Sequence, residues 1–403
     1  MSRGGTGRGA GGFRARLRDL PPTVRGLGLV SFFNDLSSEM IYPLLPTFLV
    51  RVLGAGIPGL ALIEGAAESA NSLVKLVSGR ISDRFGRRKP LVAAGYALAA
   101  ATRPLLAVSA APWHVLGLRV ADRIGKGVRT APRDALLAEA TPAGSRGLGF
   151  AVQRSLDHAG ALAGPLVAGA LLAAFGVDLR LLFALAAIPA AGALVVLARV
   201  VREQVPSASG PPRRAAARSV VMARDLRWLL GTFFVFTLGN STDAFLLLRA
   251  ENLGVPVVSL PFLWAAFHAS KALLSAPGGD LADRVGARPA IGLGWGIYAL
   301  VYVGFAVATE AWHVWLLFLA YGAYFGLAEG PEKALVSRMA GEGAMGAAMG
   351  AYQLAIGIGA LPASLLFAFV WHGYGPPAAF TLGAGIASLA VLFLFLGGRR
   401  PPA

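Results

Sequence analysis

The chain has 403 residues, of which 56% are hydrophobic and 14% charged, and its mean hydropathy is +0.63. This composition excludes a soluble globular domain of that length and is typical of a polytopic membrane protein. The formal net charge of +16 would suit a nucleic-acid-binding protein, but in so apolar a chain we interpret it as the Lys and Arg bias that orients membrane proteins, and we expect no nucleic-acid partner.

Twelve apolar segments follow one another along the chain, each long enough for a hydrocarbon core of ~30 Å, which needs ~20 helical residues. The first six lie near residues 26–50, 58–78, 90–110, 113–133, 147–173 and 180–199. The second six lie near residues 228–250, 257–277, 290–309, 312–333, 346–371 and 377–397. The sequence therefore predicts an all-α membrane protein with twelve transmembrane helices in two pseudo-symmetric six-helix bundles.

Polar and basic segments divide these helices into predicted units. Residues 1–25 form a basic tail, 26–200 an N-terminal bundle, 201–226 a linker rich in Pro, Ser and Arg, 227–397 a C-terminal bundle and 398–403 a second tail. Because Lys and Arg stay on the cytoplasmic side, both termini are expected there. The first helix has no cleavage site and is the expected targeting signal. The Arg-, Ala- and Gly-rich composition indicates a prokaryote, so the expected location is the bacterial cytoplasmic (inner) membrane.

One loop sequence occurs twice, about 200 residues apart. GRISDRFGRRKP, residues 79–90, returns as GGDLADRVGARP, residues 278–289, each time between two apolar segments. The tripeptide Trp-His-Val at 113–115 also returns, at 312–314. A match at a nearly constant offset indicates two duplicated halves, an arrangement typical of secondary transporters.

The first copy of this loop resembles the signature G-x-x-x-D-R-x-G-R-R/K between spans two and three of the major facilitator superfamily. The matching residues are Gly79, Asp83, Arg84, Gly86, Arg87 and Arg88. The resemblance covers essentially the whole chain. It implies that the loop is a conformational latch, in which an arginine pairs with an acid at the end of span four, here Asp134. The second copy keeps Asp283 and Arg284 but has Ala287 in place of an arginine, so a weaker latch is expected.

A second partial resemblance lies in span five. Gly160, Gly164, Pro165 and Gly169 are similar to the G-x-x-x-G-P motif of exporters in this superfamily that exchange substrate for protons, although Ala168 stands where the motif prefers glycine. The resemblance favours export. The alternative interpretation is ordinary packing, because small residues let helices approach closely and proline bends a span.

Charged side chains inside spans cost ~2.5–3.5 kcal/mol each on insertion scales and are functional candidates. The family lines its cavity with spans one, four, seven and ten. The candidates for proton coupling and the substrate cavity are Asp35, Glu39, Arg119, Asp122, Arg123, Arg154, Asp157, Asn240, Asp243, Tyr321 and Tyr324. The first half is richer in charge, so ion coupling is expected there. Alternatively, paired carboxylates only fix helix packing, and the tyrosines belong to the bundle core.

Together these features predict a secondary transporter of a small molecule, with proton-coupled export by alternating access as the leading hypothesis. One alternative is a proton symporter that imports an anionic nutrient or siderophore, attracted by Arg119, Arg123 and Arg154. A further alternative is a non-transporting sensor or accessory protein. An enzyme is not expected, because no phosphate-binding loop, H-E-x-x-H pattern or nucleophile elbow is present. We expect a monomer in the lipid bilayer, with protons and a small molecule as partners and without a cofactor or metal site; zero Cys and six Met also disfavour a soft-metal substrate.

Overall fold

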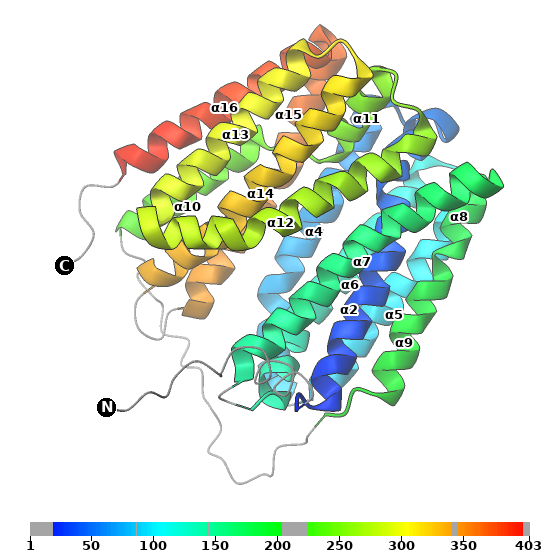
Figure 1. Cartoon of the computed structure of the whole chain (residues 1–403), viewed down its shortest axis with the longest axis vertical. Coiled ribbons are helices and arrows are strands. Elements are labelled where there is room, and N and C mark those ends of the chain that lie inside the picture. Colours follow the sequence, from blue (N-terminus) through cyan, green and yellow to red (C-terminus); the bar gives the residue numbers. More distant parts are fainter. Residues whose placement is uncertain (1–18, 86, 143–144, 204–223, 341–344, 398–403) are drawn as a thin grey trace, which may run out of the picture.

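The first half of the chain is a bundle of long helices (Figure 1). The computed structural model describes residues 19–85, 87–142, 145–203, 224–340 and 345–397; the side chains of residues 79–80, 82–85 and 345 are outside the description. The helices of this half are α2 (Pro22–Ile41), extended by η1 (Tyr42–Leu44), α3 (Leu45–Thr47) and η2 (Phe48–Val52), then α4 (Gly56–Phe85), α5 (Lys89–Leu105) with η3 (Leu106–Val108), α6 (Pro112–Ala140), α7 (Arg146–Phe175), α8 (Leu179–Leu185) and α9 (Ala187–Arg199).

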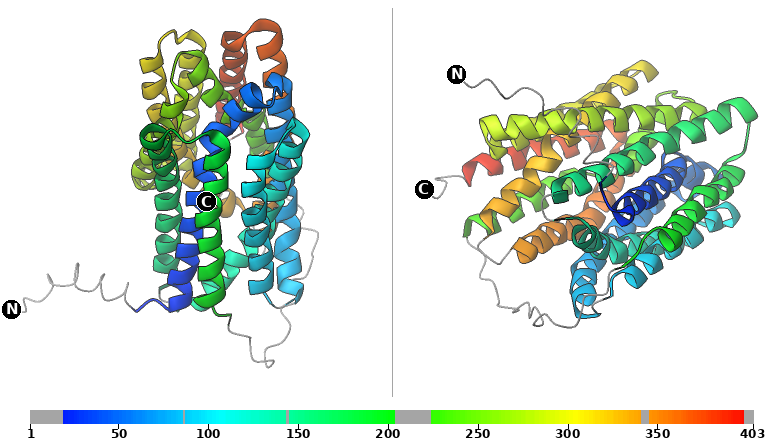
Figure 2. Two further views of the ribbon diagram at one scale, coloured as in Figure 1. Left: turned by 90° about the vertical axis from the view of Figure 1, so that its right-hand side faces the viewer. Right: turned by 60° about the horizontal axis from the view of Figure 1, so that its bottom comes forward.

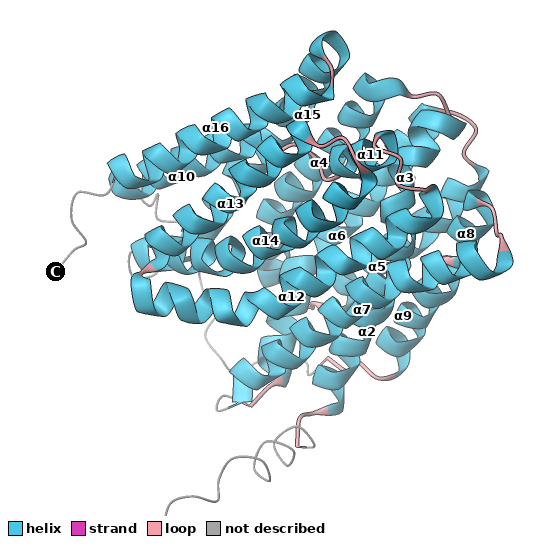
Figure 3. Cartoon of the chain, turned by 45° about the horizontal axis from the view of Figure 1, so that its top comes forward, coloured by secondary structure: helices cyan, strands magenta, loops and turns pink. Residues whose placement is uncertain are grey.

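The second half is built in the same way, and no strand occurs in the described part of the chain (Figure 3). Its helices are α10 (Arg224–Gly239), α11 (Ala244–Asn252), η5 (Val257–Ser259) continuing into α12 (Leu260–Val285), α13 (Ala287–Val307), α14 (Ala311–Met339), α15 (Met345–Tyr374) and α16 (Pro376–Leu396). Nine helical segments among the described residues are long and apolar enough to cross a membrane. The segments 22–52, 56–85 and 112–140 are not among the nine; α4 and α6 are long enough but rich in charge, and the count of twelve stays a prediction.

Two predicted continuous spans are interrupted. Pro43 and Pro46 lack the backbone N–H that a helix interior needs, and the chain passes there through short 3₁₀, α and π segments. The other interruption is the polar run 240–243 between α10 and α11, where the hydroxyl of Tyr298 donates to the carbonyl of Gly239 at 2.9 Å. Irregular backbone at membrane depth is tolerated where protein groups satisfy it or where it lines a cavity.

The two halves meet along two pairs of helices. Helix α4 contacts α15, and α7 contacts α12; the close run of α7 beside α12 is visible in Figures 1 and 2. Within the halves, α4 packs on α6 and α12 packs on α14, at equivalent positions of the repeat. Gly127 of α6 and Gly326 of α14, 199 residues apart, lie close against α4 and α12 respectively, where a Cβ would come within 2.8 Å of another heavy atom. The duplication seen in the loops therefore extends to helix packing.

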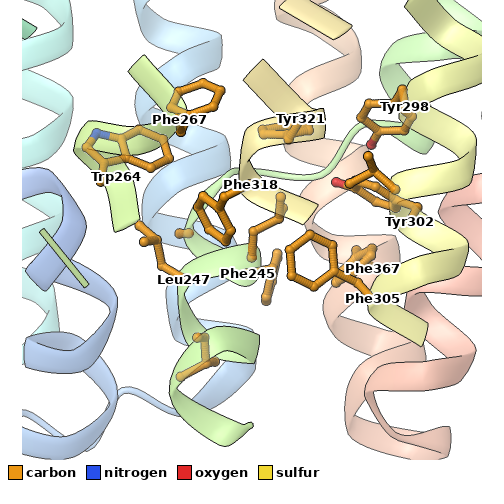
Figure 4. Packing of buried hydrophobic residues seen from close by; sticks show 14 of the residues in the cluster. Phe245, Leu247, Trp264, Phe267, Tyr298, Tyr302, Phe305, Phe318, Tyr321 and Phe367 are labelled. Carbon is orange, nitrogen blue, oxygen red and sulfur yellow. The ribbon is translucent and has the colours of Figure 1, made fainter. Parts of the chain in front are cut away.

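An aromatic core fills much of the second half (Figure 4). Phe236 stacks on Trp295 with ring centroids 4.2 Å apart, and Tyr298 stacks on Tyr302 at the same distance. Phe305 stacks on Phe380 at 5.2 Å. Offset-stacked and edge-to-face rings stabilise such cores beyond their buried area. Of these rings, Phe236 also lines the cavity described next.

Candidate functional site

A cavity of about 480 Å³ lies between the two halves. Its lining comes from α2, η1, α4 and α6 of the first half, and from α10, α12, α14, α15 and the break between α10 and α11 in the second. The volume is within the ~300–1,000 Å³ range of small-molecule sites. Five residues expected at the cavity line it: Glu39, Arg123, Asn240, Asp243 and Tyr324.

Glu39 connects the halves inside this cavity. The indole Nε1 of Trp264 on α12 donates to Glu39 Oε2 at 2.8 Å, and His268 Nε2 lies 3.6 Å from the same oxygen. Glu39 and His268 keep 21% and 14% of their side-chain surface exposed. One turn earlier, Asp35 accepts a bond from Asn34 at 2.8 Å and is not part of the lining. Of the two acids on the predicted face, Glu39 is the one that touches the second half.

Asp243 lies at the break between α10 and α11. The hydroxyl of Tyr321 on α14 donates to Asp243 Oδ1 at 2.6 Å. Tyr298 donates at 3.4 Å to Oδ1 of Asn240, and Tyr324 borders the cavity directly. The interruption of the helix therefore brings a carboxylate and an amide to the cavity, surrounded by tyrosines.

A second connection between the halves is centred on Glu329 of α14. Its carboxylate accepts from Lys333 at 2.8 Å, lies 2.9 Å from the ammonium of Lys271, and accepts from Arg154 of α7 at 3.0 Å. Arg154 is 52% exposed and does not line the cavity, whereas the other three residues do. Arg154, which was predicted to lie in the cavity, instead forms a contact between the two halves outside the cavity lining.

Arg119 and Asp122 belong to an ion-pair network within the first half. Arg119 donates twice to Glu64, both times at 2.8 Å, and its side chain is 8% exposed. Asp122 lies 3.4 Å from Arg103 and 3.9 Å from Arg119. Neither Arg119 nor Asp122 lines the cavity, and Asp157 and Tyr321 lie outside its lining as well.

Arg123 and Lys126, on the next turns of α6, are placed differently. Both line the cavity, and neither has a carboxylate oxygen within 4.0 Å among the described residues. They are three positions apart and therefore share one helix face. The structure separates Arg119, held by its own half, from Arg123, which faces the cavity.

Several lining residues were missed by sequence reasoning. Glu332 of α14 accepts from Trp295 at 2.8 Å and from Tyr352 at 2.7 Å, both neutral donors. The other missed lining residues include Glu68, Lys126, Trp264, Lys271, Glu329 and Lys333. The repeat carried a usable signal, since Trp264 and His268 stand 200 positions after Glu64 and Glu68, two acids of the second predicted span.

At the end of the molecule where α4 begins, which we call the Gly56 end, a buried acid links the two halves. Glu251 of α11 accepts from the hydroxyl of Thr47 at 2.8 Å and pairs with Arg51, and its side chain is 2% exposed. Thr47 and Arg51 belong to the irregular extension of α2. This contact joins the halves on the side opposite Arg154 and was not predicted.

The predicted latch is described only in part. Gly79, Asp83, Arg84 and Gly86 lie outside the residues whose side chains the structure describes, whereas Arg88 pairs with Glu139 at the end of α6. The carboxylate of Asp134 accepts from its neighbour Arg133 at 2.8 Å. Arg87 is exposed. In the second copy, Arg284 pairs with Asp280 at 2.8 Å on the surface, near Asp283 in sequence.

The exporter-like motif lies at two close helix contacts. A Cβ on Gly164 would come within 2.6 Å of the Leu36 carbonyl oxygen on α2, and one on Gly160 would collide with the carbonyl oxygen of Phe32. Gly169 packs on the ring of Phe262 near the start of α12. Pro165 lies within α7, which continues to Phe175. The motif therefore brings α7 against both α2 and the second half.

No group of three or more His, Cys, Asp or Glu residues suited to a metal occurs in the described ranges.

The family model of the Major Facilitator Superfamily matches residues 27–364 and 229–403. An uncharacterised MFS-type transporter of Methanocaldococcus jannaschii is 31% identical, over 94% of this chain and 95% of its own length. The class E tetracycline resistance protein of Escherichia coli is 26% identical, over 94% and 96%. Among solved structures, the nucleoside transporter NupG superposes with a TM-score of 0.79 at 12% identity, covering 93% of this chain and all of the other. The chain is a multi-pass membrane protein and belongs to the Major Facilitator Superfamily of transporters.

Proposed function

We propose that the protein is a proton-coupled exporter of a small molecule that works by alternating access. The observation that carries this proposal is the contact of Glu39 with Trp264 and His268 across the two halves, inside the cavity. A bond to an ionised carboxylate is roughly twice as strong as a bond between neutral groups. Protonation of Glu39 therefore weakens a link between the halves, and a proton that binds two conformations unequally shifts their populations.

Export is supported by relatives and by one motif. The relatives include proteins named for tetracycline resistance and for multidrug resistance, at 26% and 25% identity. The glycines of α7 match the motif of proton-exchanging exporters in part. In our proposal the termini are cytoplasmic, the protein is a monomer in the bacterial cytoplasmic membrane, and the closed Gly56 end faces outward. The arrangement described above is then the inward-facing state.

The proposal is tested in proteoliposomes with an imposed pH gradient and a pH-sensitive dye inside. Tetracycline is the first probe, followed by a panel of sugars, organic anions and siderophores. The native protein is expected to move protons when its substrate is added, whereas Glu39→Gln abolishes this movement and retains substrate counterflow. The control is Asp225→Asn, an exposed acid in the first turn of α10. Unchanged proton movement in Glu39→Gln would refute the role of Glu39, and substrate flux without proton movement would refute proton coupling.

A second function, proton symport of an anionic nutrient into the cell, is supported by Arg123 and Lys126, the two cavity cations for which no described residue places a carboxylate within 4.0 Å. The direction of flux separates the two functions. Right-side-out vesicles that accumulate the substrate when the outside is acidified would favour import, and vesicles that lose preloaded substrate under the same gradient would favour export.

A further inference from the structure

The cavity has two chemically different sides. Its first-half side carries charged residues of α2, α4 and α6, and its second-half side combines most of the aromatic lining residues with the charged residues Asp243, Lys271, Glu329, Glu332 and Lys333. The aromatic lining residues are Tyr42 from the first half and Phe233, Phe236, Trp264, Phe267, Tyr324, Phe325 and Tyr352 from the second. A molecule that fills the cavity therefore contacts the charged residues of α4 and α6 on one side, and aromatic rings together with further charged residues on the other.

The lining cations of the two halves differ in how closely acids pair with them. Lys271 and Lys333, in the other half, are bound to Glu329, but Arg123 and Lys126 have no carboxylate oxygen within 4.0 Å among the described residues. Acids attract these two cations only over longer distances: Glu68 acts on both, Asp122 on Arg123, and Asp35 and Glu39 on Lys126. Lys75 on α4 also acts on Glu68. Arg123 and Lys126 thus face the cavity without a close carboxylate partner among the described residues.

The carboxylates of the cavity are better satisfied than these cations. Each of five acids accepts a hydrogen bond from a side chain on another helix: Glu39 from Trp264, Glu64 from Arg119, Asp243 from Tyr321, Glu329 from Arg154, and Glu332 from Trp295 and Tyr352. A ligand cation would have to compete with these donors. A ligand anion would instead fill an unmet requirement, because a buried charge is stable only when it is paired.

The opposite wall suits an apolar, planar body. Phe325 is half-buried and already carries the ammonium of Lys271 over its ring at 4.3 Å, while Phe236 and Tyr324 present buried rings 5.8 Å apart. These rings are held by packing against Trp295 and Tyr298. A pre-formed aromatic wall binds a flat ring without the entropic cost of ordering side chains.

We propose that the substrate is an organic anion with an aromatic body, whose carboxylate or similar anionic group binds between Arg123 and Lys126 while its ring packs on the wall formed by Phe236, Tyr324 and Phe325. This inference rests on the proposed function only in taking the cavity as the transport site. It holds for either direction of transport and does not depend on proton coupling.

The test is equilibrium binding to the purified protein in detergent, without transport. Three probes share one ring system and differ in charge: 2-naphthoate, 2-naphthylmethanol and 2-naphthylmethylammonium. We expect 2-naphthoate to bind at least tenfold more tightly than the other two. A fourth probe, the saturated decahydro-2-naphthoate, is expected to bind more weakly than 2-naphthoate. Equal or tighter binding of the alcohol or the ammonium would overturn the anion assignment. Equal binding of the saturated acid would overturn the aromatic part, and no binding of 2-naphthoate would overturn the whole proposal.

Variants locate the site. Arg123→Gln and Lys126→Gln are each expected to weaken 2-naphthoate binding at least tenfold while leaving the alcohol unaffected, and Arg123→Lys is expected to recover part of the affinity. The control is Arg146→Gln, an exposed cation at the start of α7 outside the lining. Thermal unfolding of each variant verifies that it is folded. Unchanged binding in folded Arg123→Gln and Lys126→Gln would overturn the site.

The two proposals can fail separately. Tight, Arg123-dependent binding of 2-naphthoate without proton movement in proteoliposomes would refute proton coupling and leave the substrate class standing. Glu39-dependent proton movement with a different substrate, together with no preference for 2-naphthoate, would refute the substrate class and leave the proposed function standing.

Discussion

Replacing Arg119 by Gln provides a sharp test of the charge assignment on α6. Arg119 donates twice at 2.8 Å to Glu64, and the two side chains are 8% and 5% exposed. The variant leaves Glu64, which lines the cavity but whose side chain is only 5% exposed, without its cation. Asp122 loses only a 3.9 Å contact and keeps Arg103 at 3.4 Å. The cost therefore comes mainly from one uncompensated carboxylate.

Removing one partner of a buried ion pair costs about 3–5 kcal/mol, and we expect Arg119→Gln to lower the free energy of unfolding by that amount. The matched control is Arg123→Gln, one turn further along the same helix. Because Arg123 has no carboxylate within 4.0 Å among the described residues, its loss should change stability by less than about 1 kcal/mol. The double variant Glu64→Gln with Arg119→Gln should be more stable than the sum of the two single changes predicts, by up to about 3 kcal/mol.

The assay is equilibrium unfolding of the purified protein in detergent, followed by intrinsic fluorescence, with binding of 2-naphthoate measured on the folded protein. We expect Arg119→Gln to lose stability and keep binding, and Arg123→Gln to do the reverse. If Arg119→Gln were as stable as the native protein and lost binding, Arg119 would face the substrate, as the sequence alone suggests, and the placement by the structure would be refuted.

Two further predictions concern the closure of the Gly56 end and the packing of α7. Glu251→Gln removes the charge that binds Arg51 and Thr47 of the irregular extension of α2. If this contact contributes about 1 kcal/mol to holding the Gly56 end closed, its loss raises the population of molecules open at that end roughly fivefold. The chain has no cysteine, so a single reporter cysteine can be introduced at Asn240. In the Glu251→Gln variant this cysteine should react roughly fivefold faster with an impermeant maleimide added at the Gly56 end than it does when Glu251 is kept. The control is Glu310→Gln, which changes an exposed acid. Gly160→Ala should cost about 1–3 kcal/mol of unfolding free energy through overpacking, whereas Gly147→Ala, with no heavy atom within 4 Å of its Cβ, should cost nothing or stabilise α7.

Each of these outcomes can fail. Labelling at Asn240 that does not change in Glu251→Gln would mean that the Gly56 end is held shut by other contacts. A Gly160→Ala variant as stable as Gly147→Ala would mean that α2 and α7 can separate without loss, contrary to their close backbone approach.

The fold could be predicted from the sequence because a lipid bilayer allows few backbone structures to cross it. A run of ~20 apolar residues in a bilayer must satisfy its backbone internally, so it becomes a helix, and the predicted segments correspond to described helices along the chain. The repeated loop predicted two duplicated halves. The packing of α4 on α6 in the first half and of α12 on α14 in the second agrees with that repeat. Prolines and the polar run 240–243 carried the signal for the two interruptions, which hydropathy averaged over a window does not resolve.

The partners of the intramembrane charges were decided only by the tertiary structure. Arg119 and Arg123 are four positions apart on one helix face and are chemically identical in sequence, yet Arg119 meets Glu64 and Arg123 meets the cavity. The difference lies in the rotation and crossing of α4 against α6, which close backbone contact at Gly127 sets. In the same way, Glu39 was separated from Asp35 by the position of α12. The sequence determined which charged residues lie in the spans, and these can be recognised because a charge in hydrocarbon is costly and therefore rare. Helix packing determined which of these residues are paired, and so which of them face the cavity without a close partner among the described residues.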